Sequence, residues 1–517
     1  MTTRTTSAKR TLFTGALILT GANIISRLLG FAYRIFMSNA IGPEGMGLYQ
    51  LIMPIYALAW SISCSGLTTA ISKLVATEKA RGRAGNMRRI LYFALLLAVV
   101  ISIVLMVVIF AFAGWIGEGI LNDARVVLPL RILAFSIPFM AAGSCIRGYF
   151  FGLQRPALPA ASQIIEQFVR MAIIFALAGT FIPRGLEYAA AAAVIGIVAG
   201  EAVSFVFVGV AYRLHRKWQE MDSSSPVMSV KSAYAALFAI SLPLTLNRIT
   251  GSFLSAVENV LIPQRLQQFG LSPEEAMSQF GKITGMAMPL IFFPSAILTA
   301  LSISLVPAIS ESVAQQNEER ITSTVSKSIL FTSVIAFGAA LIFVVFPSEI
   351  GRIVYNQDLA SILLILGLMC PFWYLNITFS GILNGLGEQV FIFRNSLIAS
   401  IINIAFVFFF VPRYGTIAFL VGWFVGLIIV TYFDIEKIRE ITCVRLQVLR
   451  WFFKPALAAL AAGLIVNYAH GRFVLRMLSE RMALIFSLGV LMGIYGVFVV
   501  LSGCIRWKDI QFIFNRK

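Results

Sequence analysis

Residues 23–50 decide the fold, and they read NIISRLLGFAYRIFMSNAIGPEGMGLYQ. They begin inside an apolar segment that runs from about Leu12 to Met37, and they end in a turn rich in glycine and proline. Arg27 and Arg34 lie seven residues apart in that segment, so a helix would direct both guanidinium groups from one face. A charge at membrane depth is costly and normally faces a partner or a water-filled cavity. The pair predicts a binding site, although either side chain could instead extend to the membrane interface.

The composition is that of a membrane protein. The 517 residues are 59% hydrophobic and 12% charged, and the mean hydropathy is +0.88. Apolar runs of about 20 residues recur along the whole chain, as in membrane-spanning helices. No soluble domain of useful size fits between them, and we expect the first span to be retained rather than cleaved. The expected class is therefore an all-α polytopic membrane protein.

The net charge of +18 has an explanation other than nucleic acid. Lysines and arginines gather in alternate connections and at both ends, which the positive-inside rule attributes to the cytoplasmic side. We expect a multi-pass protein of the bacterial plasma membrane with both termini in the cytoplasm. The five cysteines form no CxxC pair, so neither disulfides nor metal centres are expected.

About fourteen spans are expected from the apolar runs. Their approximate limits are 11–38, 48–74, 90–114, 126–151, 158–182, 187–212, 233–256, 279–309, 326–346, 358–384, 389–411, 415–435, 451–469 and 482–503. The proline-bearing eighth span should be kinked or broken. Pro273 is a plausible start of a short helix at the outer surface.

An internal repeat links the fourth and tenth spans at a constant offset of 233 residues. The matched positions are Pro138 with Pro371, Gly148 with Gly381, and Gly152 with Gly385. Likewise, Arg-Leu-Leu-Gly at 27–30 in the first span matches Arg-Ile-Thr-Gly at 248–251 in the seventh. We therefore predict two pseudo-symmetric six-helix halves, related by an axis along the membrane normal, and two C-terminal helices. The predicted divisions are a first half at 1–214, a cytoplasmic linker at 215–232, a second half at 233–440, and the two added helices with a basic tail at 441–517.

Four further charged residues fall within predicted spans. Arg147 could reach a cavity or pair with a lipid phosphate. Glu166 and Arg170 are spaced i, i+4, so they could neutralise each other or form a proton- or ion-linked gate. Glu201 has no obvious local partner and could titrate near neutrality or pair with a neighbouring helix.

Asn247 and Arg248 hold, in the seventh span, the places of Ser26 and Arg27 in the first. Repeat-related arginines from facing halves would converge near a central axis. Arginine offers paired donors to phosphate or pyrophosphate, so an anionic ligand is favoured. The sequence contains no Walker A loop, HExxH or GxSxG triad, and we expect neither an enzyme nor a cofactor, although transport could be coupled to membrane potential, H⁺ or Na⁺.

Motifs along nearly the full chain resemble the stage V sporulation protein B family, within the polysaccharide and lipid-linked-sugar flippases of the multidrug/oligosaccharidyl-lipid/polysaccharide exporter superfamily. The resembling segments are RLLGF at 27–31, IGPEGMGLY at 41–49, GLTTAISKLVA at 66–76, RGYF at 147–150, SQIIEQFVR at 162–170, EYAAA at 187–191 and LVPAISE at 305–311. The resemblance implies two six-helix halves around a central cavity that opens alternately to each side. In the related lipid II flippases, cavity arginines hold pyrophosphate and the last two helices form a groove for the polyprenyl tail.

Arg27 matches one cavity arginine of that motif. The sequence departs from the lipid II flippases where their Arg-Asp pair is replaced by Tyr33-Arg34 and where an arginine is missing near Pro289. These departures favour the sporulation-type branch with a related lipid-linked substrate.

The leading hypothesis is a monomeric flippase that exports an undecaprenyl-pyrophosphate-linked wall precursor or polysaccharide intermediate, for spore cortex peptidoglycan. Arg27 and Arg248 would bind pyrophosphate, Arg34 and Arg147 would guide it, and Glu166 with Arg170 would gate or stabilise. Membrane lipids and cell-wall synthases are expected partners, and nucleic acid is not. Two alternatives remain: a cation-coupled multidrug antiporter of the same fold, and a non-transporting scaffold for wall synthesis.

Overall fold

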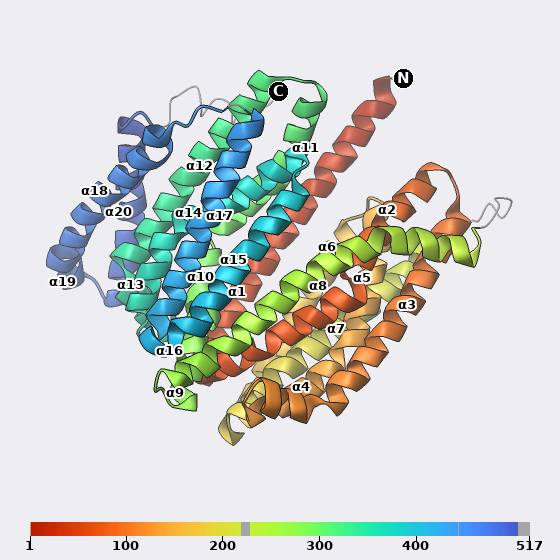
Figure 1. The fold of residues 1–517 in the computed structure, drawn as a ribbon, viewed down its shortest axis with the longest axis horizontal. Coiled ribbons are helices and arrows are strands. Elements are labelled where there is room, and N and C mark those ends of the chain that lie inside the picture. Colours follow the sequence, from red (N-terminus) through yellow and green to blue (C-terminus); the bar gives the residue numbers. More distant parts are fainter. Residues whose placement is uncertain (1, 219–227, 443, 505–517) are drawn as a thin grey trace. The chain divides into compact units, whose positions relative to one another are not determined.

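The computed structural model describes residues 2–218, 228–442 and 444–504, and the side chains of residues 2–20, 22–24 and 216–218 are not described. All secondary structure in these ranges is helical (Figure 1). The chain forms two compact units, Met1–Gly281 and Lys282–Lys517. Half of the predicted linker, at 219–227, and the part of the predicted basic tail from 505 onward lie outside the described residues. The division into repeat halves stays a prediction.

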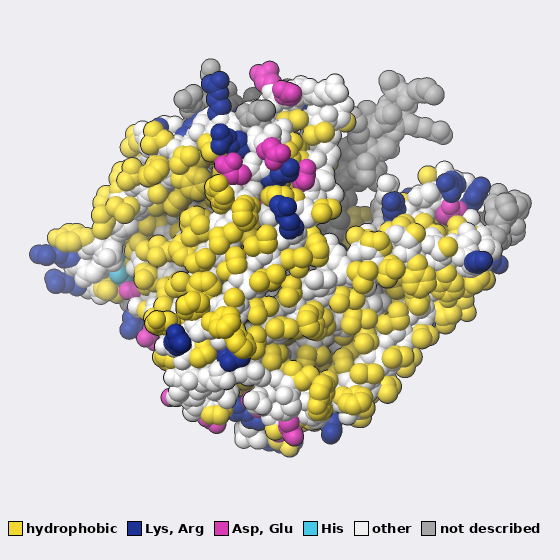
Figure 2. Space-filling model, viewed as in Figure 1, with side chains coloured by type: hydrophobic (Ala, Val, Ile, Leu, Met, Phe, Trp, Pro, Cys, Tyr) yellow, Lys and Arg dark blue, Asp and Glu magenta, His cyan; other side chains and the backbone are white. Residues whose placement is uncertain are grey.

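Length and composition give twelve helices in the described ranges that could cross a membrane, or up to thirteen with a bent pair. The chain is thus a multi-pass membrane protein, and the expected count of fourteen is not confirmed. Two predicted spans fall within one 56-residue candidate, Ile25–Ala80. The predicted span 126–151 is a pair of helices, Ala124–Ala134 and Ser136–Gly152, bent by 42°. Hydrophobic side chains cover most of the surface shown in Figure 2, and Lys, Arg, Asp and Glu gather mainly toward the helix ends.

The first unit is built from the following elements. They are α1 (Thr2–Trp60), η1 (Ser61–Ser65), α2 (Gly66–Ala80), α3 (Ala84–Ala111), η2 (Trp115–Ile120), η3 (Ala124–Val126), α4 (Val127–Ala134), α5 (Ser136–Gly152), α6 (Ala157–Phe181), η4 (Ile182–Arg184), α7 (Leu186–Trp218), α8 (Val230–Gln268) and α9 (Pro273–Phe280). Buried apolar residues of α2, α3 and α5 form its main core, joined by Val208 of α7 and Leu237 of α8.

The glycine- and proline-rich turn divides α1 into two helices. Gly42 has φ 70° and ψ −178°, a backbone conformation that glycine adopts far more easily than other residues. Pro43 follows at the start of the second helix, where its missing N–H costs nothing. Helix α9 packs directly on this turn, because a side chain at Gly47 would meet the carbonyl of Met277 and one at Gly281 would meet the carbonyl of Pro43.

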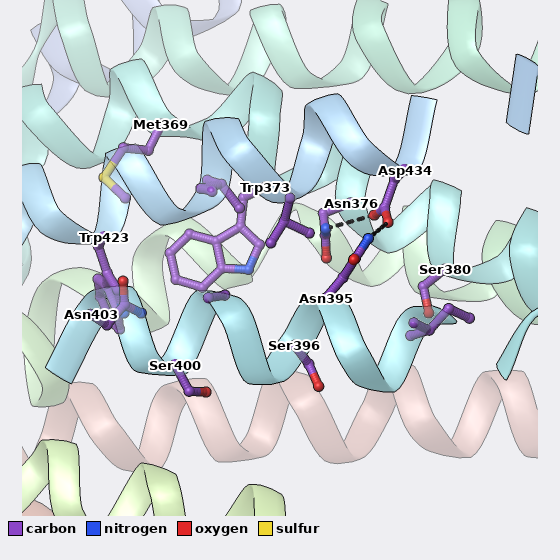
Figure 3. A pocket seen from close by; sticks show the side chains of 14 residues that line it. Met369, Trp373, Asn376, Ser380, Asn395, Ser396, Ser400, Asn403, Trp423 and Asp434 are labelled. Carbon is purple, nitrogen blue, oxygen red and sulfur yellow. Dashed lines mark hydrogen bonds between the residues drawn. The ribbon is translucent and has the colours of Figure 1, made fainter. Parts of the chain in front are cut away.

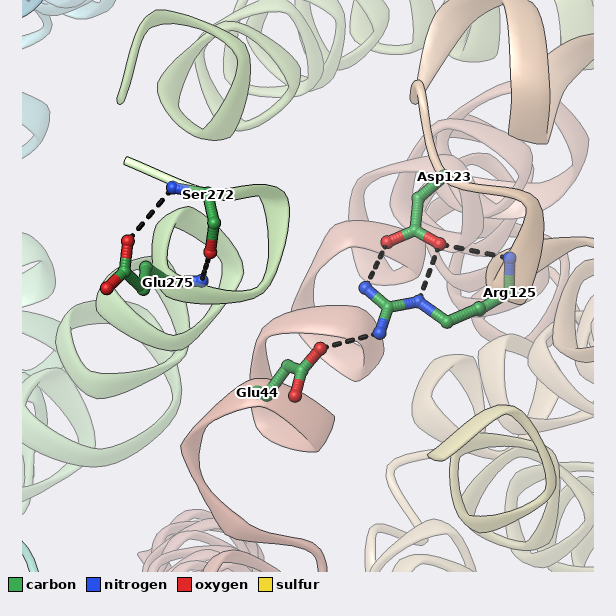
Figure 4. Close-up of polar contacts among 5 residues, drawn as sticks. All are labelled: Glu44, Asp123, Arg125, Ser272 and Glu275. Atoms are coloured by element: carbon green, nitrogen blue, oxygen red, sulfur yellow. Dashed lines mark hydrogen bonds and ion pairs between the residues drawn. The ribbon is translucent and has the colours of Figure 1, made fainter. Parts of the chain in front are cut away.

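Polar contacts fix this end of the first unit (Figure 4). Arg125, which precedes α4, donates to Asp123 at 2.9 and 2.7 Å and to Glu44 of the turn at 2.5 Å. Helix α9 begins with a capping box: the Glu275 N–H donates to the Ser272 hydroxyl at 3.2 Å, and the Ser272 N–H donates to the Glu275 carboxylate at 2.9 Å. The predicted helix start at Pro273 is confirmed.

The second unit is built from the elements that follow. They are α10 (Met288–Phe292), α11 (Ser295–Ala314), α12 (Glu318–Val345), α13 (Pro347–Tyr355), α14 (Ala360–Leu386), α15 (Gln389–Phe409), α16 (Val411–Tyr414), α17 (Thr416–Thr442), η6 (Leu449–Phe453), α18 (Lys454–Ala469), η7 (His470–Val474), α19 (Leu475–Met477) and α20 (Glu480–Leu501), and the π-helical η5 (Gly281–Ala287) leads into them. The expected break in the eighth span lies between α10 and α11, at Phe293 and Pro294.

The same glycine contacts recur in each unit. In the first unit, Gly148 and Gly152 of α5 lie against the backbone carbonyls of Thr68 and Ser72 in α2. In the second, Gly381 and Gly385 of α14 lie against those of Ser302 and Val306 in α11. These are the two glycine pairs that the sequence repeat matches at an offset of 233 residues. The residues that they contact, Thr68 with Ser302 and Ser72 with Val306, are also matched, at an offset of 234 residues. Close helix approach through small residues therefore explains why these positions repeat.

We predict opposite effects for two glycine-to-alanine changes in the first unit. Gly148→Ala places a methyl group 2.7 Å from the Thr68 carbonyl oxygen, where backbone must move, and should destabilise the fold by about 1–3 kcal/mol. Gly209→Ala in α7 is the control, because nothing lies within 4 Å of the added carbon. Its better helix propensity should leave stability unchanged or raise it by up to about 1 kcal/mol. Unfolding of the purified protein in mixed detergent micelles measures both; equal stability of the two variants would contradict the packing described.

Candidate functional site

A cluster of charged and phenolic side chains lies where α1, α6 and α7 pack together in the first unit. On α6, the Arg170 guanidinium is 2.8 Å from the Glu166 carboxylate, and both side chains are less than one fifth exposed. On α7, the buried Glu201 accepts a hydrogen bond from the Tyr56 hydroxyl of α1 at 2.6 Å. Glu166 interacts electrostatically with Glu201 as well as with Arg170, so the two hydrogen-bonded pairs form one cluster.

Two glycines of α7 let that helix approach the charged turns of α6. Gly196 and Gly200 form a G-x-x-x-G pattern, which is common at tight helix contacts in membranes. A Cβ at Gly200 would lie 2.9 Å from the Glu166 carbonyl oxygen, and one at Gly196 would lie 3.1 Å from that of Arg170. Because the two glycines have no side chains, α7 packs closely on the turns of α6 that carry the ion pair and excludes lipid from that side of the pair.

Arg147 of α5 extends the cluster. Its guanidinium donates to the Ser204 hydroxyl of α7 at 3.2 Å and to the Ser144 hydroxyl of its own helix at 2.8 Å. Both serines are buried, and Arg147 also acts electrostatically on Glu166. Of the predicted site residues, the structure therefore gathers Arg147, Glu166, Arg170 and Glu201 in one place.

The tyrosines of this cluster were not among the predicted site residues. Tyr33, Tyr49 and Tyr56 of α1 all interact electrostatically with Arg170. The seven-residue spacing of Tyr49 and Tyr56 does place them on one helix face, and that spacing was the available signal. The cluster thus surrounds two arginines and two glutamates with hydroxyl groups, which can hydrogen-bond to either charge.

The remaining predicted residues have a different environment. The side chains of Arg27, Asn247 and Arg248 are exposed and that of Arg34 is half-buried, and none of the three arginines forms an ion pair within the described ranges. Arg248 lies over the indole of Trp60, with its guanidinium carbon 5.1 Å from the ring centroid. This contact leaves its N–H donors available, because a ring face accepts the charge without hydrogen-bonding it.

Arg27 and Trp60 lie on the two arms of α1 that meet at Gly42. At 1.5 Å per residue, Arg27 is about 22 Å and Trp60 about 27 Å from that turn along their helices. Helix α8 is held near Trp60 by a 2.8 Å hydrogen bond between the hydroxyls of Ser61 and Ser252. Arg27 and Trp60, the residue that Arg248 contacts, thus lie at comparable distances from the turn along the two arms of α1.

A family model described as "Polysaccharide biosynthesis protein" matches residues 12–313, which is more than half of the chain. This chain belongs to the polysaccharide biosynthesis protein family. A second family model, MatE, matches residues 282–409. The predicted resemblance is confirmed: the chain is 30% identical over 447 residues to "Stage V sporulation protein B" of Bacillus subtilis (strain 168), covering 85% of this chain and 86% of that protein.

Comparison with solved structures shows the fold of this chain. A structure titled "Lipid II flippase MurJ, inward closed conformation" is similar with a TM-score of 0.72 and 15% identity, over 96% of this chain and 99% of that one. An inward-facing multidrug resistance MATE family transporter of the MOP superfamily gives a TM-score of 0.63 and 13% identity, over 82% of this chain and 98% of that one. The fold is thus that of MOP superfamily transporters, and these relatives are flippases and transporters rather than enzymes.

The ion pair on α6 should show strong coupling between its two members. Arg170→Gln leaves Glu166 without its partner in a poorly solvated place and should cost about 3 kcal/mol of stability. Glu166→Gln should cost a similar amount, and the double variant Glu166→Gln with Arg170→Gln should lose less than the sum of the single changes. Unfolding of the four proteins in mixed micelles gives the coupling; strictly additive losses would show that the two charges do not stabilise each other.

Proposed function

We propose that this protein is a flippase that moves an undecaprenyl-pyrophosphate-linked wall precursor, or a related polysaccharide intermediate, outward across the bacterial plasma membrane. The observation that carries the proposal is a set of arginines that have no carboxylate partner in the described ranges, Arg27, Arg34 and Arg248, in a multi-pass member of the polysaccharide biosynthesis protein family. An arginine that no carboxylate neutralises is suited to an anionic ligand. Two phosphate groups offer several oxygens that can accept paired N–H donors.

Alternating access is the mechanism that this fold supports. Helix-packing contacts through Gly148, Gly152, Gly381 and Gly385 make each unit a firmly packed body. Exposed arginines would bind the pyrophosphate while the protein is open to the cytoplasm. Reorientation would then expose the bound group to the other side, and the lipid tail would stay in the membrane.

The buried cluster would couple this movement to an energy source. The Glu201 carboxylate has one oxygen bonded to Tyr56, and its second oxygen has no hydrogen-bond partner in the described structure. That oxygen could bind a proton or a cation. Either event would change the charge beside Glu166, with which Glu201 interacts electrostatically, and would so alter the Glu166–Arg170 ion pair. Membrane potential, H⁺ and Na⁺ are the energy sources that such a device could use.

The cellular setting follows from the same proposal. Both termini would lie in the cytoplasm, and the flippase would act as a monomer that supplies precursor to cell-wall synthases. The similarity to a stage V sporulation protein supports a role in spore cortex peptidoglycan. Membrane lipids would surround the exposed apolar surface seen in Figure 2.

Translocation of fluorescent undecaprenyl-pyrophosphate-linked muropeptide in proteoliposomes tests the proposal. A hydrogen bond to a charged group contributes about 1.5–3 kcal/mol, so Arg27→Gln and Arg248→Gln should each slow transport by about tenfold to a hundredfold. Arg131→Gln of α4 is the control, because Arg131 is another exposed arginine without an ion pair in the described structure.

Three outcomes would count against the proposal. Unchanged transport by both variants would remove these arginines from the site. Efflux of a cationic drug without movement of any polyprenyl lipid would favour a multidrug antiporter. Absence of any translocation by the native protein, with rescue of wall synthesis in cells, would favour a scaffold.

A further inference from the structure

The second unit contains a cavity of about 460 Å³ that is lined by α14, α15 and α17, and several polar side chains lie within its mostly apolar lining (Figure 3). Its volume lies within the ~300–1,000 Å³ range of ligand-binding pockets in proteins. Asparagine and serine side chains from α14 and α15 supply most of its polar surface, and two tryptophans supply aromatic surface. None of its lining residues is Lys, Arg or His, and one, Asp434, is acidic. The cavity is therefore unsuited to pyrophosphate, which needs positive charge.

Asp434 is the polar centre of the cavity. Its side chain is buried, and its two carboxylate oxygens accept hydrogen bonds from Asn376 at 3.1 Å and from Asn395 at 2.8 Å. Figure 3 shows these three side chains converging from three helices. Asn395 is only 1% exposed, and its side-chain oxygen has no hydrogen-bond partner in the described structure. Such an orphaned acceptor indicates that a donor belongs here.

The two tryptophans are held in fixed orientations. Trp373 makes edge contacts with Phe292 and Trp423, with ring centroids 4.4 and 5.4 Å apart. When the Asn403 amide is turned so that its oxygen faces the ring, it accepts from the Trp423 indole N–H at 2.9 Å. Rigid aromatic surface beside buried acceptors is a pre-organised arrangement, so little ordering is needed when a ligand binds.

A bare metal ion fits this arrangement poorly. Hard cations are held by several converging oxygens, whereas here two N–H groups already point at the carboxylate. No group of three His, Cys, Asp or Glu side chains that could hold a metal occurs in the described residues. The cavity is also far larger than an ion. An uncharged ligand with many hydroxyl donors and one apolar face matches the lining better.

We propose that this cavity binds a sugar ring of the transported molecule. This inference rests on the proposed function, which supplies a saccharide, and it locates where that saccharide is recognised. A pyranose ring carries C–H groups on its faces, which pack on the Trp373 indole, and hydroxyl groups at its rim. The hydroxyls donate to the remaining acceptor positions of Asp434 and to the Asn395 oxygen. Serines 380, 396 and 400 add hydrogen-bonding groups along the wall.

The test compares two lipids on the full-length protein in nanodiscs. One is undecaprenyl pyrophosphate that carries the muropeptide sugars, and the other is undecaprenyl pyrophosphate alone. The native protein should bind the sugar-bearing lipid at least about tenfold more tightly, which is the effect of about 1.4 kcal/mol of contact. In Trp373→Leu and in Asp434→Asn the ratio of the two dissociation constants should fall toward one. Trp115→Leu, which alters a 66% exposed indole of the first unit, should keep the native ratio.

The remaining outcomes separate this inference from the proposed function. A native protein that binds both lipids equally, or cavity variants that keep the native ratio, would overturn the sugar site alone. Binding of both lipids that is weakened equally in the cavity variants would also overturn it, since that result indicates a structural role for Trp373 and Asp434. Sodium-dependent binding that is lost in Asp434→Asn while the ratio persists would identify a cation site instead. A native protein that binds neither lipid would overturn the proposed function, and the sugar site with it.

Discussion

The free-energy cost of placing charge in a hydrocarbon layer governs where this chain puts its polar residues. Glu166 and Arg170 form an ion pair on α6, and Gly196 and Gly200 allow α7 to approach the turns of α6 that carry them. Tyr56 reaches Glu201 from a third helix. Without these partners each buried charge would destabilise the bundle, so the packing of α1, α6 and α7 depends on the cluster as much as the cluster depends on the packing.

Polar groups thus serve three purposes in separate places. Glu166 and Arg170 of α6 form an ion pair, and Glu201 of α7 accepts a hydrogen bond from Tyr56, so these buried charges have partners within the first unit. Arg27 and Arg248 are exposed and without ion pairs in the described structure, which suits an anionic group. The cavity around Asp434 in the second unit has no basic residue and suits a neutral, hydroxyl-rich one. The two kinds of site therefore differ in the chemistry of the group that each one suits.

Local patterns in the sequence predicted local features well. The break at Pro294, the α9 start at Pro273 and the repeated glycines all depend on the chemistry of one or two residues. The number of spans was harder to predict, because Ile25–Ala80 passes as a single apolar candidate although it is broken at Gly42, and because 126–151 is a bent pair. Contacts between helices distant in sequence, such as Tyr56 with Glu201 or Asn395 with Asp434, could not be predicted, because they depend on how helices rotate and tilt against each other.

Labelling with a charged, membrane-impermeant maleimide tests most directly whether Arg27 faces water while the α6 pair is enclosed. The measurement needs a chain without its five native cysteines and with one new cysteine, from Arg27→Cys, Arg170→Cys or Val206→Cys, where Val206 is an exposed apolar residue that we expect to face lipid. We expect labelling at position 27, slowed by undecaprenyl pyrophosphate, and little labelling at position 170 or 206. Protection of position 27 from the reagent in every condition that keeps the protein folded, or equal labelling at all three positions, would contradict it.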